Sequence, residues 1–229
     1  MRSSLSTRRE FVLTACAGIV GVSVFPRAGG QGKAETLDLA ALLDAKRLNV
    51  VNRTATRLTD GSRTGVHLSE SAGDGVALIG GVEFADGTIE CDLRGKDVQQ
   101  QSFLGVAFHG VDGTTFDGVY FRPFNFKAAD PERHAHAVQY ISHPTYTWQK
   151  LRTEQPGKYE QPVDPAPDPN GWFHARVVVA SPKVSVFVND ATAPSLVVTQ
   201  LSDRRKGLVG LWVGNTAGGD FANLKITHS

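Results

Sequence analysis

Hydrophobic and polar residues alternate along both halves of one segment, residues 102–126. The apolar residues that share one face of this alternation are Leu104, Val106, Phe108, Val119 and Phe121. Because successive side chains of a β-strand point to opposite faces, that face is expected to pack on a core. Asp112-Gly113 separates the halves and is typical of a tight hairpin turn. The segment therefore predicts a β-hairpin, and the residues expected on its other face are His109, Tyr120 and Arg122.

Further short apolar segments continue the pattern toward the C-terminus. The expected strands are residues 50–54, 65–68, 76–79, 87–94, 103–110, 118–126, 135–142, 172–180, 183–189, 196–201, 207–213 and 221–227. Asp-Gly dipeptides recur, beginning at Asp60, Asp74, Asp86, Asp112 and Asp117, and this dipeptide tolerates the positive φ of tight turns. Short strands with regular turn signals predict an all-β antiparallel sandwich over residues 50–229. Residues 35–49, with Leu39, Leu42 and Leu43 on one helical face, are expected to form a helix or a loosely ordered arm.

A proline-rich segment, residues 144–171, interrupts the strands. It holds six prolines, so it cannot be a central strand, and it is too long for an ordinary hairpin loop. Residues 147–153 are expected to form a short helix within it, close to the aromatic residues Tyr146, Trp148 and Tyr159. Two interpretations remain open, a binding loop and a surface excursion that its aromatic residues hold in place.

The N-terminus has the pattern of an export signal. Residues 6–12, Ser-Thr-Arg-Arg-Glu-Phe-Val, resemble a twin-arginine motif, and an apolar run of fifteen residues, 11–25, follows. Because about 20 residues are needed to span a bilayer, we expect residues 1–34 to be a cleaved leader that ends near Gly30 or at Ala34. The alternative is a lipobox at residues 13–16 with acylation of Cys16, although the stretch between the arginine pair and Cys16 is short for an h-region. Both interpretations place the domain outside the cytoplasm.

Net charge limits the possible binding partners of the domain, and cysteine content limits how it can be stabilised. Five of the 24 basic residues but only one of the 23 acidic residues precede residue 35, so the remaining chain carries a charge near −3. That balance predicts neither a nucleic-acid surface nor a polybasic membrane patch. Cys91 alone would survive cleavage of the leader and has no second cysteine with which to form a disulfide. The domain is therefore expected to be stabilised by packing alone.

Three sequence segments resemble those of a known family. They are residues 84–93, FADGTIECDL, residues 175–190, and residues 207–212 with 219–226. In their order they resemble the concanavalin A-like lectin and glucanase superfamily, and within it the extracytoplasmic bacterial domains grouped as 3-keto-disaccharide hydrolases. The resemblance implies a jelly-roll β-sandwich with a concave binding sheet, a carbohydrate partner and, as an option, calcium.

The same resemblance allows the catalytic residues of the superfamily to be compared with one expected strand, residues 87–94. Laminarinase-type enzymes of the superfamily carry paired acidic residues on one strand, and Glu90 and Asp92 match part of that pattern, but Arg94 stands where a further acid is needed. A retaining glycosidase requires two carboxylates about 5–5.5 Å apart, and arginine can fill neither role. The sequence therefore argues against a laminarinase-like mechanism.

The alternation of side chains along the strands predicts that one sheet face is polar. If Ile89, Cys91 and Leu93 point inward, the residues on the opposite face are Glu90, Asp92 and Arg94. We expect this face to be shared with further polar and aromatic residues, which are His109, Tyr120, Arg122, Gln139 and Trp212. Trp148 of the proline-rich segment is expected to add a binding contact. Such a mixture suits sugar hydroxyls and ring faces, while the simpler alternative is a solvated ladder of cross-strand ion pairs.

Metal ligands are less clearly indicated. His134, His136 and His143 lack the spacing of a zinc motif, and we predict no firm metal site. Asp112, Asp117 and Asp220 would be the candidates for calcium, although turn formation explains such residues equally well.

The leading hypothesis is an exported carbohydrate-recognising domain that cleaves glycosidic bonds next to an oxidised sugar. Glu90 or His109 would act as the base and Arg122 would polarise the keto group. Two alternatives of other classes are a non-catalytic, lectin-like glycan-binding module and a protein-interaction domain that uses the proline-rich segment.

Overall fold

The computed structural model describes residues 32–229. Most of the expected leader, including Cys16 and the cleavage position near Gly30, lies outside the described residues. The alternative cleavage position, Ala34, lies within them. Among the residues that are described, no helix is long and apolar enough to cross a membrane.

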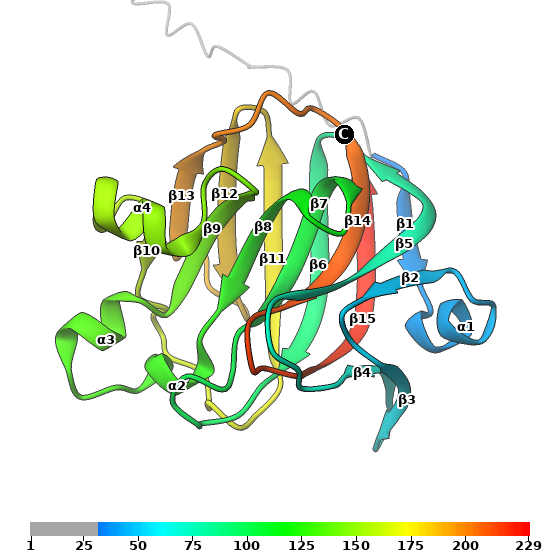
Figure 1. Ribbon diagram of the computed structural model, residues 1–229, viewed down its shortest axis with the longest axis horizontal. Coiled ribbons are helices and arrows are strands. Elements are labelled where there is room, and N and C mark those ends of the chain that lie inside the picture. Colours follow the sequence, from blue (N-terminus) through cyan, green and yellow to red (C-terminus); the bar gives the residue numbers. More distant parts are fainter. Residues whose placement is uncertain (1–31) are drawn as a thin grey trace, which may run out of the picture. The chain divides into compact units, whose positions relative to one another are not determined.

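Two antiparallel sheets form a sandwich (Figure 1). The β6 sheet has the order β13-β12-β11-β6-β15-β4-β3, with β1 also paired to β15. Its strands are β13 Leu196–Thr199, β12 Lys183–Val188, β11 Phe173–Ala180, β6 Gly87–Arg94, β15 Gly219–His228, β4 Arg63–Leu68, β3 Ala55–Asp60 and β1 Ala34–Leu37. The β8 sheet has the order β10-β9-β8-β7-β14-β5-β2. Its strands are β10 Glu160–Gln161, β9 Val138–His143, β8 Thr115–Phe121, β7 Leu104–Asp112, β14 Gly207–Val213, β5 Gly75–Phe84 and β2 Leu48–Val51. The expected all-β jelly-roll sandwich is confirmed.

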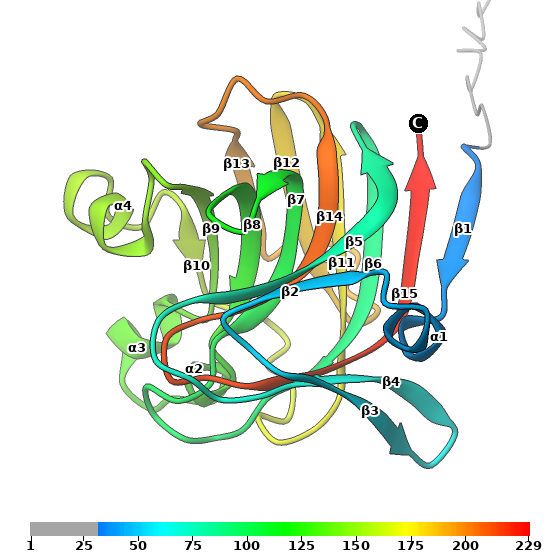
Figure 2. The same cartoon turned by 45° about the vertical axis from the view of Figure 1, so that its right-hand side comes forward.

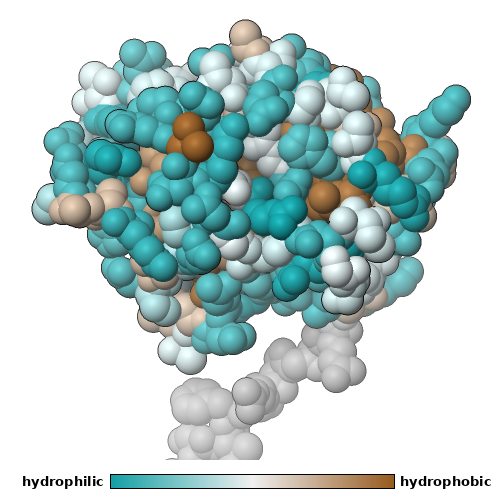
Figure 3. Space-filling view, turned by 90° about the horizontal axis from the view of Figure 1, so that it is seen from below, coloured by the Kyte–Doolittle hydropathy of each residue, from teal (hydrophilic) through white to brown (hydrophobic). Residues whose placement is uncertain are grey.

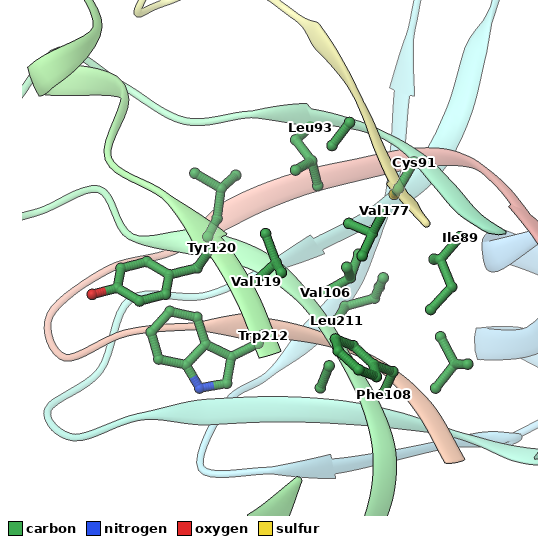
Figure 4. Packing of buried hydrophobic residues seen from close by; sticks show 14 of the residues in the cluster. Ile89, Cys91, Leu93, Val106, Phe108, Val119, Tyr120, Val177, Leu211 and Trp212 are labelled. Atoms are coloured by element: carbon green, nitrogen blue, oxygen red, sulfur yellow. The ribbon is translucent and has the colours of Figure 1, made fainter. Parts of the chain in front are cut away.

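Alternation along the strands builds the core between the two sheets. In β6 the inward residues Ile89, Cys91 and Leu93 are buried while their neighbours are half-buried. Val119 of β8 and Leu211 of β14 pack against them from the other sheet, as the close view shows (Figure 4). Burial raises the pKa of the Cys91 thiol, so this cysteine is a core residue.

Within residues 32–229, four short helices lie outside the sheets. They are α1 Leu39–Asp44, α2 Pro123–Phe126, α3 Pro131–Ala135 and α4 Trp148–Glu154. The expected helix over residues 147–153 is α4, which begins at a Thr147 cap whose hydroxyl accepts the Lys150 amide. From below, the surface is mainly hydrophilic, with small, separate hydrophobic patches (Figure 3).

The structure differs from the expected strands at particular places. The strand expected to run through residue 126 ends at Phe121, because Pro123 starts α2. The strand expected from residue 135 begins at Val138, after α3. Strands β3 and β10 were not expected. Asp117-Gly118, expected as a turn, lies inside β8, while Asp112 does form a turn by accepting the Thr114 amide at 2.8 Å.

The N-terminal segment belongs to the sandwich. Residues 35–49 were expected to precede the domain as a helix or a loose arm, and α1 supplies the helix. The flanking strands, however, join both sheets, because β1 pairs with β15 and β2 pairs with β5 (Figure 2). Leu37, Leu39 and Leu42 are buried. The folded unit therefore begins earlier than the sequence pattern predicts.

Candidate functional site

A cleft of about 650 Å³ lies on the outer face of the β8 sheet, the face directed away from the core. Its floor is made by Tyr120 of β8 and Trp212 of β14. These rings lie beside each other with centroids 4.8 Å apart (Figure 4). Both alternate along their strands with core residues, so strand parity alone directs them outward. The structure thus places Trp212 on the outer face and not between the sheets.

Loops and helices form the walls of the cleft. The residues contributed by these segments are Asp74, Gln99, Gln100, Gln101, Phe103, Phe124, Asn125, Glu132, Arg133, His136, Trp148, Arg152, Gly214, Asn215 and Thr216. Of the predicted site residues, Tyr120, Arg122, Trp148 and Trp212 line the cleft, and Gln139 lies directly behind Tyr120. The wall residues in loops carry no periodic pattern in the sequence, which explains why they were not predicted.

Arg122 links the residues at the cleft floor by hydrogen bonds. Its Nη2 donates to both Tyr120 Oη and Gln139 Oε1, and its Nη1 donates to the His136 carbonyl at 2.9 Å. The Tyr120 hydroxyl itself donates to Gln139 Oε1 at 2.7 Å. Burial raises the pKa of Tyr120 to about 12, so the phenol stays neutral. These contacts fix the ring of Tyr120 and give the floor one rigid arrangement.

Glu160 is the buried counter-charge of the cleft. It receives three charge-assisted hydrogen bonds from Arg152: Nε to Oε1 at 3.0 Å, Nε to Oε2 at 3.3 Å, and Nη2 to Oε2 at 2.7 Å. Arg122 Nη1 lies 3.6 Å from the same carboxylate. The residue sits in the two-residue strand β10, opposite Gln139 of β9. Sequence reasoning missed Glu160 because a two-residue strand between prolines gives no periodic signal.

His136 joins this group at the end of α3. Its Nδ1 lies 2.9 Å from Glu160 Oε2, although the two atoms are not aligned for a hydrogen bond. Burial lowers the pKa of His136, and the nearby guanidinium groups of Arg152 and Arg122 act in the same direction, while Glu160 opposes the shift. The imidazole is therefore neutral near pH 7.

Unpaired polar atoms concentrate around the cleft. Six buried side-chain nitrogen or oxygen atoms of the described residues lack a hydrogen-bond partner. Four of them belong to residues that line the cleft, namely Asn125 Oδ1, Arg133 Nε, His136 Nδ1 and Trp212 Nε1. Buried polar groups in folded proteins are paired almost without exception. These four atoms are polar groups that a ligand in the cleft could pair.

The proline-rich segment is part of this site. Its helix α4 supplies Trp148 and Arg152, and β10 supplies Glu160. Tyr159 and Val163 are buried, and Leu151 anchors α4 to the core. Trp148 is exposed and carries the Arg152 guanidinium over its ring at 5.2 Å. The segment therefore combines both expected features, since Tyr159 holds it in place and Trp148 and Arg152 line the cleft.

His109 does not face the cleft, contrary to the sequence-based expectation. A β-bulge interrupts the pairing of β7 with β8 after Phe108, and His109 adopts a φ of 50°. Its Nε2 contacts the Ala85 carbonyl at 2.8 Å and its Nδ1 contacts Gln200 Nε2 at 3.0 Å. Both ring nitrogens are occupied and the residue is completely buried. The bulge breaks the parity on which the prediction rested.

His109 belongs to an interior cluster around Asp117. Burial alone would raise the pKa of Asp117, but the neighbouring His109, Ser202 and Ser142 side chains and the charge of Arg204 hold it below its usual range. Ser202 Oγ donates to Asp117 Oδ2 at 2.6 Å. The cluster holds the segment after β13 against the sheet.

Glu90, Asp92 and Arg94 lie on the β6 sheet, not on the sheet that carries the cleft. The expectation that one face gathers them with Tyr120 and Gln139 is therefore wrong, because parity defines faces within a strand but not which sheet the strand joins. On the outer face of the β6 sheet they form ion pairs. Glu90 binds Lys225 at 3.0 Å, Asp92 contacts His174 at 2.8 Å, and Arg94 binds Asp60 at 2.7 Å. The solvated ladder was the correct interpretation for these three residues.

The candidate metal ligands also lie apart. Asp117 is buried in the β8 sheet, Asp220 contacts His67 at 2.7 Å in the β6 sheet, and Asp112 caps a turn. Across residues 32–229, no three histidine, cysteine or acidic side chains gather in a way that could hold a metal ion.

The known proteins that this chain resembles have the same type of fold. No protein-family description matches the chain, and no curated sequence does. Among solved structures, the carbohydrate-binding module CBM66 from Bacillus subtilis matches with a TM-score of 0.52 and 17% identity over 78% of this chain and 98% of that chain. A protein of unknown function with a galectin-like fold, also from Bacillus subtilis, gives 0.59 and 14% over 86% and 97%. The exoplasmic/lumenal domain of VIP36 in its Ca²⁺/Man-bound form gives 0.51 and 9% over 80% and 83%.

These similarities define the class to which the molecule belongs by fold. The two sheets are a concanavalin A-like, galectin-like sandwich. At this level of identity the comparison describes architecture, and function has to be argued from the cleft itself.

Proposed function

We propose that the cleft of the β8 sheet binds a saccharide. The observation that carries this proposal is the pairing of an aromatic floor, Tyr120 and Trp212, with walls of guanidinium, amide and carboxylate groups. Sugars present apolar ring faces and rings of hydroxyls, so they need aromatic surfaces and convergent donors and acceptors together. The exposed indole of Trp148 provides a further stacking surface at the rim.

Charge and volume support the same proposal. The cationic groups at the cleft, Arg122, Arg133 and Arg152, are balanced by Glu160, Glu132 and Asp74. A site without excess charge fits a neutral, polyhydroxylated ligand better than a phosphate or an acidic peptide. A volume of about 650 Å³ lies within the roughly 300–1,000 Å³ usual for small-molecule sites. The names of two structural neighbours, a carbohydrate-binding module and a mannose-bound domain, point in the same direction.

Calorimetric titration with glucose, mannose, fructose and their linear oligosaccharides tests the proposal. We expect saturable binding to at least one series. Trp148→Ala should weaken it about three- to tenfold, because stacking on an aromatic side chain contributes roughly 0.5–1.5 kcal/mol. Trp172→Phe is the matched control, since Trp172 lies on the other sheet between Arg63 and Arg94. No binding to any series, or equal loss in both variants, would contradict the proposal.

Acid/base cleavage of a 3-keto-glycoside is a second candidate function, and His136 favours it. Its neutral imidazole is held beside Glu160 and next to Arg122. With a proton on Nδ1 toward Glu160, Nε2 has a free lone pair that can take the proton from the carbon next to the keto group. The resulting electron pair moves onto the keto oxygen, which Arg122 stabilises, and the glycosidic oxygen then leaves as the enolate collapses and takes up a proton from solvent.

This assignment replaces Glu90 and His109, neither of which lies in the cleft, and keeps Arg122. If it holds, His136→Gln should reduce turnover of a 3-keto-glucoside at least a hundredfold while the affinity changes little. His174→Gln, on the other sheet, serves as the control. Undiminished turnover in His136→Gln would refute the mechanism, and binding without any product would favour a lectin-like module.

We further propose that the protein is exported through its twin-arginine leader. The support is the sequence of residues 6–12 and the apolar run that follows. Replacing Arg8 and Arg9 with lysines should keep the precursor in the cytoplasm, and cell fractionation with N-terminal sequencing measures this. Export of the Lys-Lys precursor at the normal rate would argue against this route, and a lipid on Cys16 would support the lipoprotein alternative.

A further inference from the structure

The outer face of the β8 sheet is only partly open. The cleft lies along the row formed by Trp212, Tyr120 and Gln139, which face each other across β14, β8 and β9 with Gly105 of β7 between them. Around this row the outward residues are apolar and buried: Val76, which continues the row on β5, and Leu78, Phe116 and Ile141, which lie beyond it, are each no more than 1% exposed. Their registers place them on the same face as the cleft, since Val76 pairs with Trp212, Leu78 with Gly210, and Ile141 with Gly118. A second, small apolar core therefore covers this part of the face.

The tip of the β7–β8 hairpin covers it. In the sheet order, β14 and β5 separate β7 from the edge strand β2. Nevertheless Gly113, at the hairpin tip, lies against Val51 of β2, so closely that a Cβ on Gly113 would come within 2.8 Å of Val51 Cγ2. The tip must therefore fold across the outer face of β14 and β5. The bulge at His109 supplies the bend, because β-bulges turn the strand and increase its twist.

Phe116 fills the outer face of the β8 sheet at its other side, next to β9. Its ring stacks on the imidazole of His143 at the end of β9, with centroids 5.1 Å apart and planes at 20°. The outer face is thus filled from β2 to β9 on one side of the Trp212–Tyr120–Gln139 row. A groove open along the whole sheet, which could hold the middle of a long chain, is absent from the described part of the molecule.

We propose that the cleft is closed at one end by the hairpin tip and recognises a saccharide terminus or a short saccharide, not an internal segment of a polysaccharide. This inference rests on the proposed saccharide function and adds the substrate class. An internally bound chain has to leave its site in two directions. Here the apolar, filled part of the sheet face adjoins the cleft floor on one side. Helix α4 and the loops with Gln99–Gln101 and Asn215 form the other walls.

Titration of one polysaccharide before and after partial cleavage tests this inference. Linear glucan, mannan and fructan samples are each divided, half is shortened by limited acid hydrolysis, and equal masses are titrated calorimetrically. We expect the number of protein molecules bound per gram to rise in proportion to the number of chain ends, which a reducing-end assay measures. Binding per gram that stays constant after cleavage would overturn the inference while leaving the saccharide function intact. If none of the samples or their short fragments binds, the proposed function fails and the inference fails with it.

A shortened hairpin gives an independent test. Replacing residues 111–114 with Asn-Gly removes the part of the tip that reaches Val51 while keeping a tight turn. This variant should gain binding to the uncleaved polymer, so that the ratio of binding before and after cleavage rises at least threefold. Val111→Thr, a change at an exposed tip residue, is the control and should bind like the natural protein. If the shortened variant does not fold, as judged by circular dichroism, the chain-end titration of the natural protein decides alone.

Discussion

At the residue scale, the cleft depends on buried charges that sequence alternation did not reveal. Arg122 and Glu160 are both almost fully buried, and Arg152 closes the pair from the solvent side. Removing a charge from such a group leaves its partner without compensation in a poorly solvated site. Tyr120, Trp212 and Arg122 could be predicted because they follow strand parity. Glu160 and the walls could not, because they sit in loops and very short elements.

Glu160→Gln should reveal this dependence. We expect the free energy of unfolding to fall by about 2–3 kcal/mol, since hydrogen bonds to a charged group are lost and Arg122 remains buried without a counter-charge. Urea unfolding at pH 7 measures the loss. Glu132→Gln, at the exposed rim of the same cleft, should change stability by less than about 0.5 kcal/mol. Equal stability of the two variants would show that Arg122 does not need Glu160.

The His174–Asp92 pair on the β6 sheet predicts a pH dependence of stability. The hydrogen bond to Asp92 raises the pKa of His174, while Asp92, despite its burial, has a lowered pKa because of His174, Asn223 and Arg63. A raised histidine pKa stabilises the fold below the unfolded-state value, and this contribution is lost as pH rises through the folded-state value. The depressed pKa of Asp92 gives the opposite limit, a loss as pH falls through its folded-state value.

The contribution is therefore present between about pH 4 and pH 6.5. The difference in unfolding free energy between the natural protein and His174→Gln should be below about 1 kcal/mol at pH 5.5, because the pair is partly exposed, and should shrink toward zero at pH 8.5. Urea titrations at the two pH values measure it. A difference that grows with rising pH would contradict the assignment.

At the element scale, helix α4 supplies part of the cleft wall and the hairpin tip of β7–β8 covers the neighbouring part of the same sheet face. The sequence predicted both as elements, from a short helical stretch and from the Asp112-Gly113 turn. It did not predict that the tip folds over the sheet, because a bulge changes direction without leaving a clear sequence signal. The same bulge moved His109 from the expected polar face into the interior.

Leu151→Ala tests the role of α4. Leu151 is 1% exposed and is the buried residue of this helix. Truncating it should lower the free energy of unfolding by roughly 2–4 kcal/mol and should also weaken saccharide binding, since Trp148 and Arg152 stand on the same helix. Thermal unfolding and calorimetric titration measure the two effects. Gln149→Ala, at an exposed position of α4, should change neither, and unaltered binding by Leu151→Ala would separate the helix from the site.

At the scale of the whole molecule, the N-terminal segment and the C-terminal strand stabilise each other. Strand β1 pairs with β15 over Ala34–Leu37, and Leu37 is buried. A leader cleaved near Gly30 would leave this pairing intact, whereas cleavage at Ala34 would remove its first residue.

A chain that begins at Asp38 should be less stable than one that begins at Gln31. Loss of β1 and of the buried Leu37 should cost roughly 3 kcal/mol, which lowers Tm by about 6–12 °C for a domain of this size. Differential scanning calorimetry of the two chains measures the shift. Identical Tm values would mean that β1 is not an integral part of the sandwich.

The sequence by itself determined the class of fold, the inward and outward faces of most strands, and part of the cleft floor. These features follow from alternation and turn residues, which act over a few neighbouring positions. The tertiary structure decided which sheet each strand joins, and so separated Glu90, Asp92 and Arg94 from Tyr120 and Arg122. It also decided where a bulge reverses parity and which loop residues surround the floor. Such choices depend on contacts between residues far apart in the chain, and no local pattern encodes them.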